Sequence, residues 1–120
     1  MRKYLEEGCL LRVFVGESDR YDGMALYEWI VQLARDHGIA GATALRGMAG
    51  YGIHHRIHTA KVLRLTTELP VIVEIVDTVE NIKRFLPVLD GVIHEGIATL
   101  ERVEIRAFGE APPHTPESEA

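Results

Sequence analysis

Hydrophobic and polar residues follow one another along this chain in two patterns, one typical of strands and one typical of helices. Five short segments are rich in apolar or β-branched residues, or alternate between apolar and charged ones, so we expect strands. These segments are residues 9–15, 42–45, 60–66, 71–76 and 99–107. Two other segments, 26–37 and 82–93, repeat their apolar residues every three or four positions, which predicts amphipathic helices.

Residues at the ends of both helical segments favour the start and the stop of a helix. Asp22 precedes the first helix as a candidate N-cap, and Gly38 follows it as a C-terminal stop. Thr78 is the candidate N-cap of the second helix, which we expect to continue past Pro87 and to end at Gly96. These signals agree with the apolar periodicity and predict two helices, each following a strand.

With one short strand of the middle hairpin counted as extra, the order of the predicted elements is strand, helix, strand, strand, helix, strand. This is the order of the ferredoxin-like α+β fold, a βαββαβ sandwich in which two helices cover one face of an antiparallel sheet. Residues 42–45 and 60–66 form its hairpin with a long tip, and a short extra strand there leaves the order unchanged. We assign residues 9–108 to this domain, 1–8 to an N-terminal extension and the proline-rich, acidic 109–120 to a disordered tail.

Strand alternation predicts a second sheet face, which the helices do not cover. The side chains expected there are Leu10, Arg12, Phe14, Ile72, Glu74 and Val76. A face of this size that mixes apolar and charged side chains is typical of a surface buried against other subunits. We therefore expect the chain to assemble with copies of itself.

The composition narrows the classes of function. The 120 residues, 47% hydrophobic and 26% charged, suffice for one globular domain with its own core. The net charge of −5 argues against nucleic-acid binding, and no apolar run reaches the roughly 20 residues that cross a bilayer. One cysteine, Cys9, fits a reducing compartment, and acidic residues follow the basic start where a signal peptide needs apolar ones. We expect a cytoplasmic protein that is not embedded in a membrane.

A glycine-rich stretch with flanking arginines is the first candidate site. Gly47, Gly50 and Gly52 would let backbone amides approach an anion, and Arg46 and Arg56 would supply positive charge. The dinucleotide-binding fingerprint needs its glycines between a strand and a helix, whereas these lead to another strand. Two interpretations stay open, a loop that holds an anionic ligand and a hairpin tip that needs glycine for its backbone conformation.

A loop after the first strand is the second candidate. Within residues 16–21, Ser18 and Arg20 could bind an anion, and Glu17 and Asp19 a cation, or the loop could only lead into the helix. Neither a serine-nucleophile motif nor a pair of carboxylates for acid–base chemistry stands out in the sequence. We therefore expect a protein that is not an enzyme.

Several sequence segments, taken in order, resemble one known family. They are LRVFVGESDRYDG (11–23), LYE (26–28), GATALRG (41–47), GYG (50–52), RIHTAK (56–61) and LPVIVEIVD (69–77). They resemble the PII-like family catalogued as domain of unknown function 190, over about residues 9–107. The resemblance implies a ferredoxin-like fold and a homotrimer, related to PII signalling proteins and to CutA-type trimers.

The resemblance also implies a function. PII proteins bind adenine nucleotides in clefts between subunits, and a long hairpin loop, here residues 47–59, changes shape to engage a transporter or an enzyme. The implied ligand-binding residues are Arg46, Gly47, Gly50, Gly52, Arg56 and His58 at this hairpin, with Glu17, Arg20 and Tyr21 at the rim. We therefore expect a regulator that binds a small anionic ligand, with an adenine nucleotide as a candidate, and signals through the hairpin.

Two other classes of function stay open. A divalent-metal-binding protein similar to CutA would use His54, His55 and His58, because imidazole is a common ligand of zinc, copper and nickel. The alternative for these histidines is a solvated loop, since a spacing of four residues aligns two of them only on a helix. A pure protein-interaction module would dock the hairpin on a partner without any small ligand.

Overall fold

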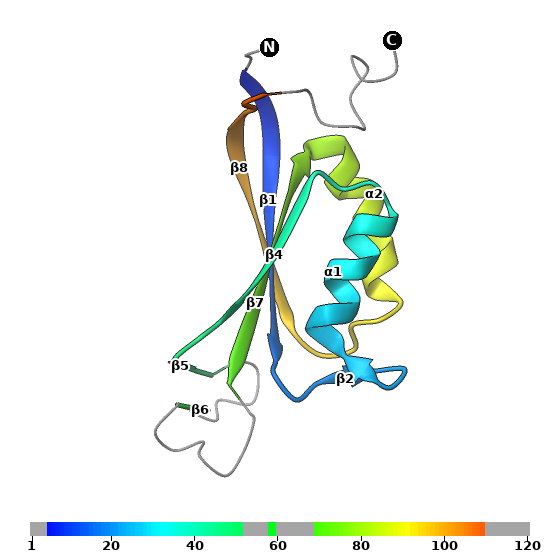
Figure 1. The fold of residues 1–120 in the computed structure, drawn as a ribbon, viewed down its shortest axis with the longest axis vertical. Coiled ribbons are helices and arrows are strands. Elements are labelled where there is room, and N and C mark those ends of the chain that lie inside the picture. The colour runs from blue at the N-terminus through cyan, green and yellow to red at the C-terminus, as the bar shows by residue number, and fades with distance from the viewer. Residues whose placement is uncertain (1–4, 52–57, 60–68, 110–120) are drawn as a thin grey trace.

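The computed structural model describes residues 5–51, 58–59 and 69–109. They form two layers, a four-stranded antiparallel sheet and a pair of helices on one of its faces (Figure 1). The main elements are β1 (Leu5–Gly16), α1 (Leu26–Asp36), β4 (Gly41–Arg46), β7 (Pro70–Thr78), α2 (Val79–Asp90) and β8 (Ile97–Arg106). The strands lie in the order β4–β7–β1–β8, which is the ferredoxin-like arrangement, so the predicted α+β fold class is confirmed.

Two very short hairpins accompany the main sheet. β2 (Arg20–Tyr21) pairs with β3 (Met24–Ala25) before α1, and β5 (Ala49–Gly50) pairs with β6 (His58–Thr59) beyond β4. Figure 1 shows the first hairpin below the start of α1 and the second at the far end of β4 and β7. The predicted strand 60–66 lies outside the described residues.

β1 is longer than the sequence pattern predicts, because it begins at Leu5 and not at Cys9. Gly8 pairs with Thr78 at the end of β7. Residues 5–7, which precede Gly8, pair only with β8 among the described strands. A two-stranded ribbon of this kind exposes both of its faces, so it does not require the apolar residues that revealed the rest of the strand. The early start therefore leaves no signal in the hydrophobic pattern.

The prediction that Asp22 caps the first helix is wrong. Asp22 and Gly23, both with positive φ (52° and 83°), form the turn between β2 and β3. An Asp-Gly pair is favoured in such turns because both central residues adopt the left-handed conformation. The residue that precedes α1 is Ala25, whose side chain accepts no capping bond, and the amide of Leu26 donates to the carbonyl of Asp19 at 2.7 Å.

The start of α2 agrees with the sequence and its end does not. The Thr78 hydroxyl accepts a hydrogen bond from the amide of Asn81 at 3.2 Å, which confirms the predicted cap, and the helix runs through Pro87 as expected. The helix ends at Asp90, however, so the predicted stop at Gly96 is wrong. Val92 and Ile93 follow the helix and still pack on the core, and their spacing therefore mimics a continuing helical face.

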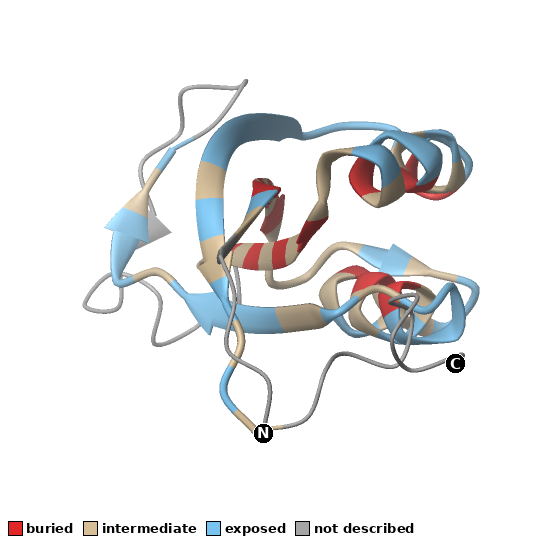
Figure 2. Cartoon of the chain, turned by 90° about the horizontal axis from the view of Figure 1, so that it is seen from above, coloured by how far each residue is buried: buried red, intermediate tan, exposed pale blue. Residues whose placement is uncertain are grey.

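The core fills the space between the helices and one face of the sheet. Buried residues alternate with half-buried ones along β1 and β7, and every third or fourth residue of each helix faces them (Figure 2). The buried core residues are Cys9, Leu11, Val13, Val15, Leu26, Ile30, Ala34, Val71, Val73, Ile75, Ile82, Phe85, Leu89 and Val92. Burial of this set stabilises the fold by the hydrophobic effect. The candidate site residues that the structure describes lie outside this core.

One charged residue is buried with this core. The carboxylate of Asp77 accepts hydrogen bonds from the amide of Ala40 at 2.9 Å, from the side-chain amide of Asn81 at 3.0 Å and from the amide of Thr78. These bonds join the connection before β4 to the start of α2. A buried carboxylate is tolerated here because backbone and side-chain donors replace its hydration.

Candidate functional site

The sheet face opposite the helices carries the side chains that strand alternation predicts, all of them half-buried in the single chain. The strand register aligns four apolar residues across the whole sheet, namely Leu45, Ile72, Phe14 and Ile97. The two at the sheet edges, Leu45 and Ile97, are 46% and 45% exposed. An apolar row of this length is an unfavourable surface in water and favours burial against another protein surface.

The next row of the same face is charged. Arg12 donates to Glu74 at 3.0 Å and to Glu101 at 2.9 Å, and thus bridges β1 to both of its neighbouring strands. The hydrogen bond to Glu74 and then that to Glu101 raise the pKa of Arg12 above its ordinary value. The guanidinium, which stays protonated in proteins, gives the face a charged centre beside the apolar row.

The base of the predicted hairpin lies at the apolar end of this face. The amide of Gly47 donates to the carbonyl of Pro70 at 2.7 Å, and that of Glu17 donates to the carbonyl of Leu69 at 2.8 Å. A Cβ atom at Gly47 would lie 2.8 Å from Cγ of Pro70, so only glycine allows this approach of the two chain segments. The carboxylate of Glu17 forms an ion pair with the guanidinium of Arg46.

Three of the predicted ligand-binding residues, Glu17, Arg46 and Gly47, therefore meet at one end of the sheet. Gly50 lies beside them, because a Cβ atom there would come within 3.3 Å of the Pro70 ring. The Gly47 amide already has a partner, so at this residue the close packing of the chain accounts for the glycine.

Other predicted site residues have different surroundings. Arg20 donates to the carbonyl of Gly23 at 2.8 Å and so closes the β2–β3 turn, and the ring of Tyr21 lies 5.5 Å from that of Trp29 on α1. Both residues thus support the start of α1. The predicted residues Gly52, Arg56, His54 and His55 lie outside the described residues, and for His58 only the backbone in β6 is described.

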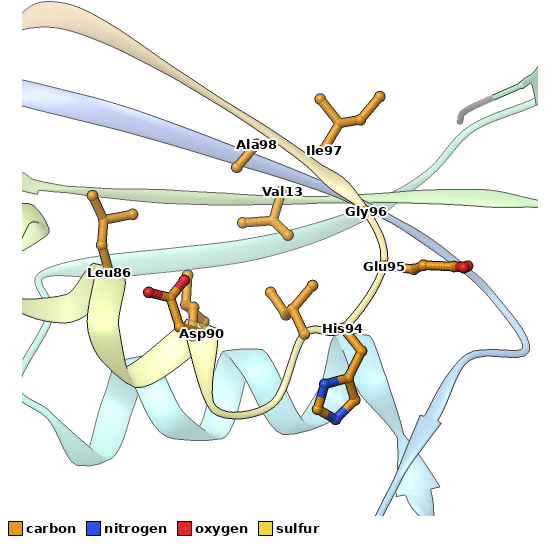
Figure 3. Close-up of a pocket in the computed structure, with 10 residues that line it drawn as sticks. Val13, Leu86, Asp90, His94, Glu95, Gly96, Ile97 and Ala98 are labelled. Carbon is orange, nitrogen blue, oxygen red and sulfur yellow. The ribbon is translucent and has the colours of Figure 1, made fainter. Parts of the chain in front are cut away.

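A shallow pocket beyond the end of α2 is a feature that the sequence pattern missed (Figure 3). Its volume is about 220 Å³, and it lies between the last turn of α2, residues 91–96 and the start of β8. Its walls are mainly apolar, and its titratable lining residues are Asp90, His94 and Glu95. Figure 3 shows the carboxylate of Asp90 beside the opening, with the His94 ring and the Glu95 side chain turned outward. With two carboxylates and neither lysine nor arginine in its lining, this pocket is not suited to a phosphate group.

The described part of the chain contains neither a metal-binding cluster nor a membrane-spanning helix. Residues 5–51, 58–59 and 69–109 contain no group of three or more His, Cys, Asp or Glu side chains that could hold a metal ion. No helix among these residues is long and apolar enough to cross a membrane. Of the predicted histidine ligands, His54 and His55 lie outside the described residues and His58 is described only by its backbone, so the metal hypothesis stays a prediction.

The sheet order, the helix layer and the hairpin beyond β4 are the features of a PII-like fold. CPII from Thiomonas intermedia K12, a nitrogen regulatory PII-like protein solved with ADP, AMP and bicarbonate, superposes with a TM-score of 0.59 at 14% identity, covering 85% of this chain and 91% of CPII. The apo form of CPII superposes with a TM-score of 0.53 at 12% identity, covering 88% and 99%. At such identities the likeness concerns the fold alone.

The sequence itself assigns the family. The chain belongs to the DUF190 family, described as "Uncharacterized ACR, COG1993", whose model matches residues 8–105. A UPF0166 protein from Aquifex aeolicus (strain VF5) is 43% identical over 96 residues, which are 80% of this chain and 90% of the relative. A UPF0166 protein from Methanocaldococcus jannaschii is 39% identical over 84 residues, 70% of this chain and 77% of the relative. The resemblance seen in the sequence segments is therefore confirmed.

Proposed function

We propose that this protein is a PII-like regulator, not an enzyme, that assembles as a homotrimer in the cytoplasm. In this proposal a small anionic ligand, with an adenine nucleotide as the first candidate, binds in the clefts between subunits. The hairpin 47–59 then reports the bound state to a partner protein such as a transporter or an enzyme. The observation that carries the proposal is the position of Arg46, an exposed cation at the hairpin base, directly after the apolar row of the outer sheet face.

Self-assembly is supported by the outer face. Its apolar row is half-exposed in the single chain, and beside this row the Arg12 guanidinium is paired with two carboxylates, those of Glu74 and Glu101. A paired charge cluster can be buried at far lower cost than an unpaired charge. Three copies of such a face can therefore pack around a common axis, with the hairpin bases near the subunit boundaries.

Anion binding is supported by the charge of Arg46 and by the kind of ligand found in the fold neighbour. The Arg46 side chain is 63% exposed, so its guanidinium is accessible to a ligand from solvent. Guanidinium groups bind phosphate oxygens through paired hydrogen bonds, which makes arginine a preferred phosphate ligand. CPII was solved with ADP and AMP, and this is why an adenine nucleotide is the first ligand to test.

Substitution of the hairpin arginine tests the proposal. We expect Arg46→Ala to weaken ADP binding about tenfold or more without a change in the mass of the assembly, because a charged hydrogen bond to phosphate is lost. Calorimetric titration with ADP measures the affinity, and sedimentation measures the mass. Arg102→Ala is the matched control, since Arg102 is equally a cation on a strand but belongs to β8 and is 75% exposed. Equal ADP affinity in Arg46→Ala and the parent protein would contradict the assigned site.

The second hairpin arginine gives an independent test. Arg56→Ala should also weaken ADP binding while the thermal stability of the assembly is unchanged. If both arginine variants bind ADP as the parent does, the ligand does not contact this hairpin.

A further inference from the structure

Glu17 is a carboxylate at the place where the proposed function requires an anion to bind. Its side chain is only 15% exposed, whereas that of its ion-pair partner Arg46 is 63% exposed. The backbone of Glu17 is held in place, because its amide donates to the carbonyl of Leu69 at 2.8 Å and the preceding Gly16 pairs with Pro70 in the sheet. The fold therefore holds the backbone of Glu17 in place, and the more exposed partner of the ion pair is the arginine.

The next residues of the loop reinforce this position. The carboxylate of Asp19 accepts a hydrogen bond from the amide of Gly16 at 2.9 Å, and the amide of Asp19 donates to the Gly16 carbonyl at 3.1 Å. These two bonds close a tight turn around Glu17. A ligand cannot easily push the loop aside, because the turn and the pairing of Gly16 with Pro70 both resist the movement.

We propose that Glu17 is an internal competitor of the ligand and determines both the affinity and the charge preference of the site. This inference rests on the proposed function. In the free protein Glu17 neutralises Arg46, and an anionic ligand binds when the Arg46 guanidinium exchanges the carboxylate for a phosphate group. Each exchange leaves a mostly covered carboxylate without its cation and close to an incoming anion, and both effects oppose binding. The repulsion increases with ligand charge, so the site disfavours the most highly charged phosphates.

The exchange also couples ligand binding at Arg46 to the base of the hairpin. The ion pair joins the loop after β1 to the last residue of β4, and the next residue, Gly47, holds the hairpin base to Pro70. When Arg46 turns to a ligand, this link between the loop and the hairpin base is broken. The hairpin then keeps its backbone bond to Pro70 and loses its side-chain bond to Glu17.

Glu17→Gln tests the competition directly, since glutamine has the shape of glutamate without its charge. We expect this variant to bind ADP about three to ten times more tightly than the parent protein. The gain should be larger for pyrophosphate than for AMP, because pyrophosphate carries more charge. In an Arg46→Ala background the gain should be smaller, because the substitution then removes only the repulsion between the carboxylate and the ligand and releases no guanidinium.

Glu28→Gln is the matched control, because it removes one acidic charge from an exposed position on α1. Its ADP affinity should equal that of the parent protein, which separates the local competition from the general effect of net charge. A gain of the same size in both glutamine variants would overturn the inference.

The outcomes also separate this inference from the proposed function. If the parent protein binds ADP and Glu17→Gln binds it equally or more weakly, the competition is refuted and the ligand site is kept. If neither protein binds ADP, AMP or pyrophosphate, the proposed function fails, and the inference fails with it. Binding by Glu17→Gln alone would support both, with Glu17 as a strong competitor.

Discussion

The two faces of the sheet are built from neighbouring residues of the same strands, yet they have opposite surroundings. On β1, Leu11 and Val13 are at most 1% exposed under the helices. Leu10, Arg12 and Phe14, which alternate with them, stay half-buried on the outer face. The inner face is completed within the chain, whereas the outer face combines an apolar row with a paired charge cluster and has no cover among the described residues. The first face stabilises the subunit, and the second is the surface through which we propose that copies of the chain assemble.

Removal of the charge at the centre of the outer face should have the largest effect. In Arg12→Ala, Glu74 and Glu101 lose their shared cation, and assembly would bury two unpaired carboxylates in each subunit. We expect association to weaken, so that the variant is monomeric at concentrations at which the parent protein assembles. Sedimentation velocity measures the mass, and Arg102→Ala, whose contact with Glu7 at 4.0 Å is exposed, should keep the mass of the parent. An unchanged mass for Arg12→Ala would refute the role of this cluster.

A pair of adjacent leucines compares the two faces with the same chemistry. We expect Leu11→Ala to lower the free energy of unfolding by about 2–5 kcal/mol, because Leu11 is fully covered by the helices and the substitution leaves a cavity. Leu10→Ala should leave the intrinsic stability of the subunit within about 1 kcal/mol and instead make unfolding more dependent on protein concentration. Urea unfolding at two protein concentrations measures both quantities. Equal losses without concentration dependence would mean that the outer face is not an interface.

The buried carboxylate of Asp77 should have a smaller effect, confined to the inner side. Asp77→Asn replaces one acceptor oxygen by a donor, facing the donors of Ala40, Thr78 and Asn81. We expect a loss of about 1–3 kcal/mol in the free energy of unfolding with no change in assembly mass. Asp36→Asn, at an exposed position near the end of α1, is the control and should change the stability by less than about 0.5 kcal/mol. If Asp77→Asn matched this control, the hydrogen-bond network would not contribute to stability.

Local patterns predicted the fold because each depends on residues close in the sequence. The alternation in residues 71–76 identified both faces of β7, and Thr78 was predicted as a cap from its position alone; both are confirmed. The errors occur where tertiary contacts replace a local signal. Asp22 looked like a cap but lies in the β2–β3 turn, and Val92 and Ile93 resembled helix positions because they pack on the core after α2 has ended.

The candidate site was predictable in part for the same reason. Arg46 and Gly47 were recognised from the local combination of positive charge and glycine. Glu17 was placed at the rim by family resemblance, but its ion pair with Arg46 joins residues 29 positions apart and could not be read from the sequence. The pocket beyond α2 was missed because the helix was expected to continue to Gly96, through the residues that line the pocket.

We have proposed that copies of this chain assemble through the outer face and bind an anionic ligand between them. Native mass spectrometry of the protein with ADP tests both parts in one spectrum. We expect a species of three chains, each of 13.4 kDa, that carries up to three ADP molecules, and an Arg46→Ala trimer with fewer. A monomer as the dominant species, or a trimer that retains no ADP at saturating concentration, would contradict it.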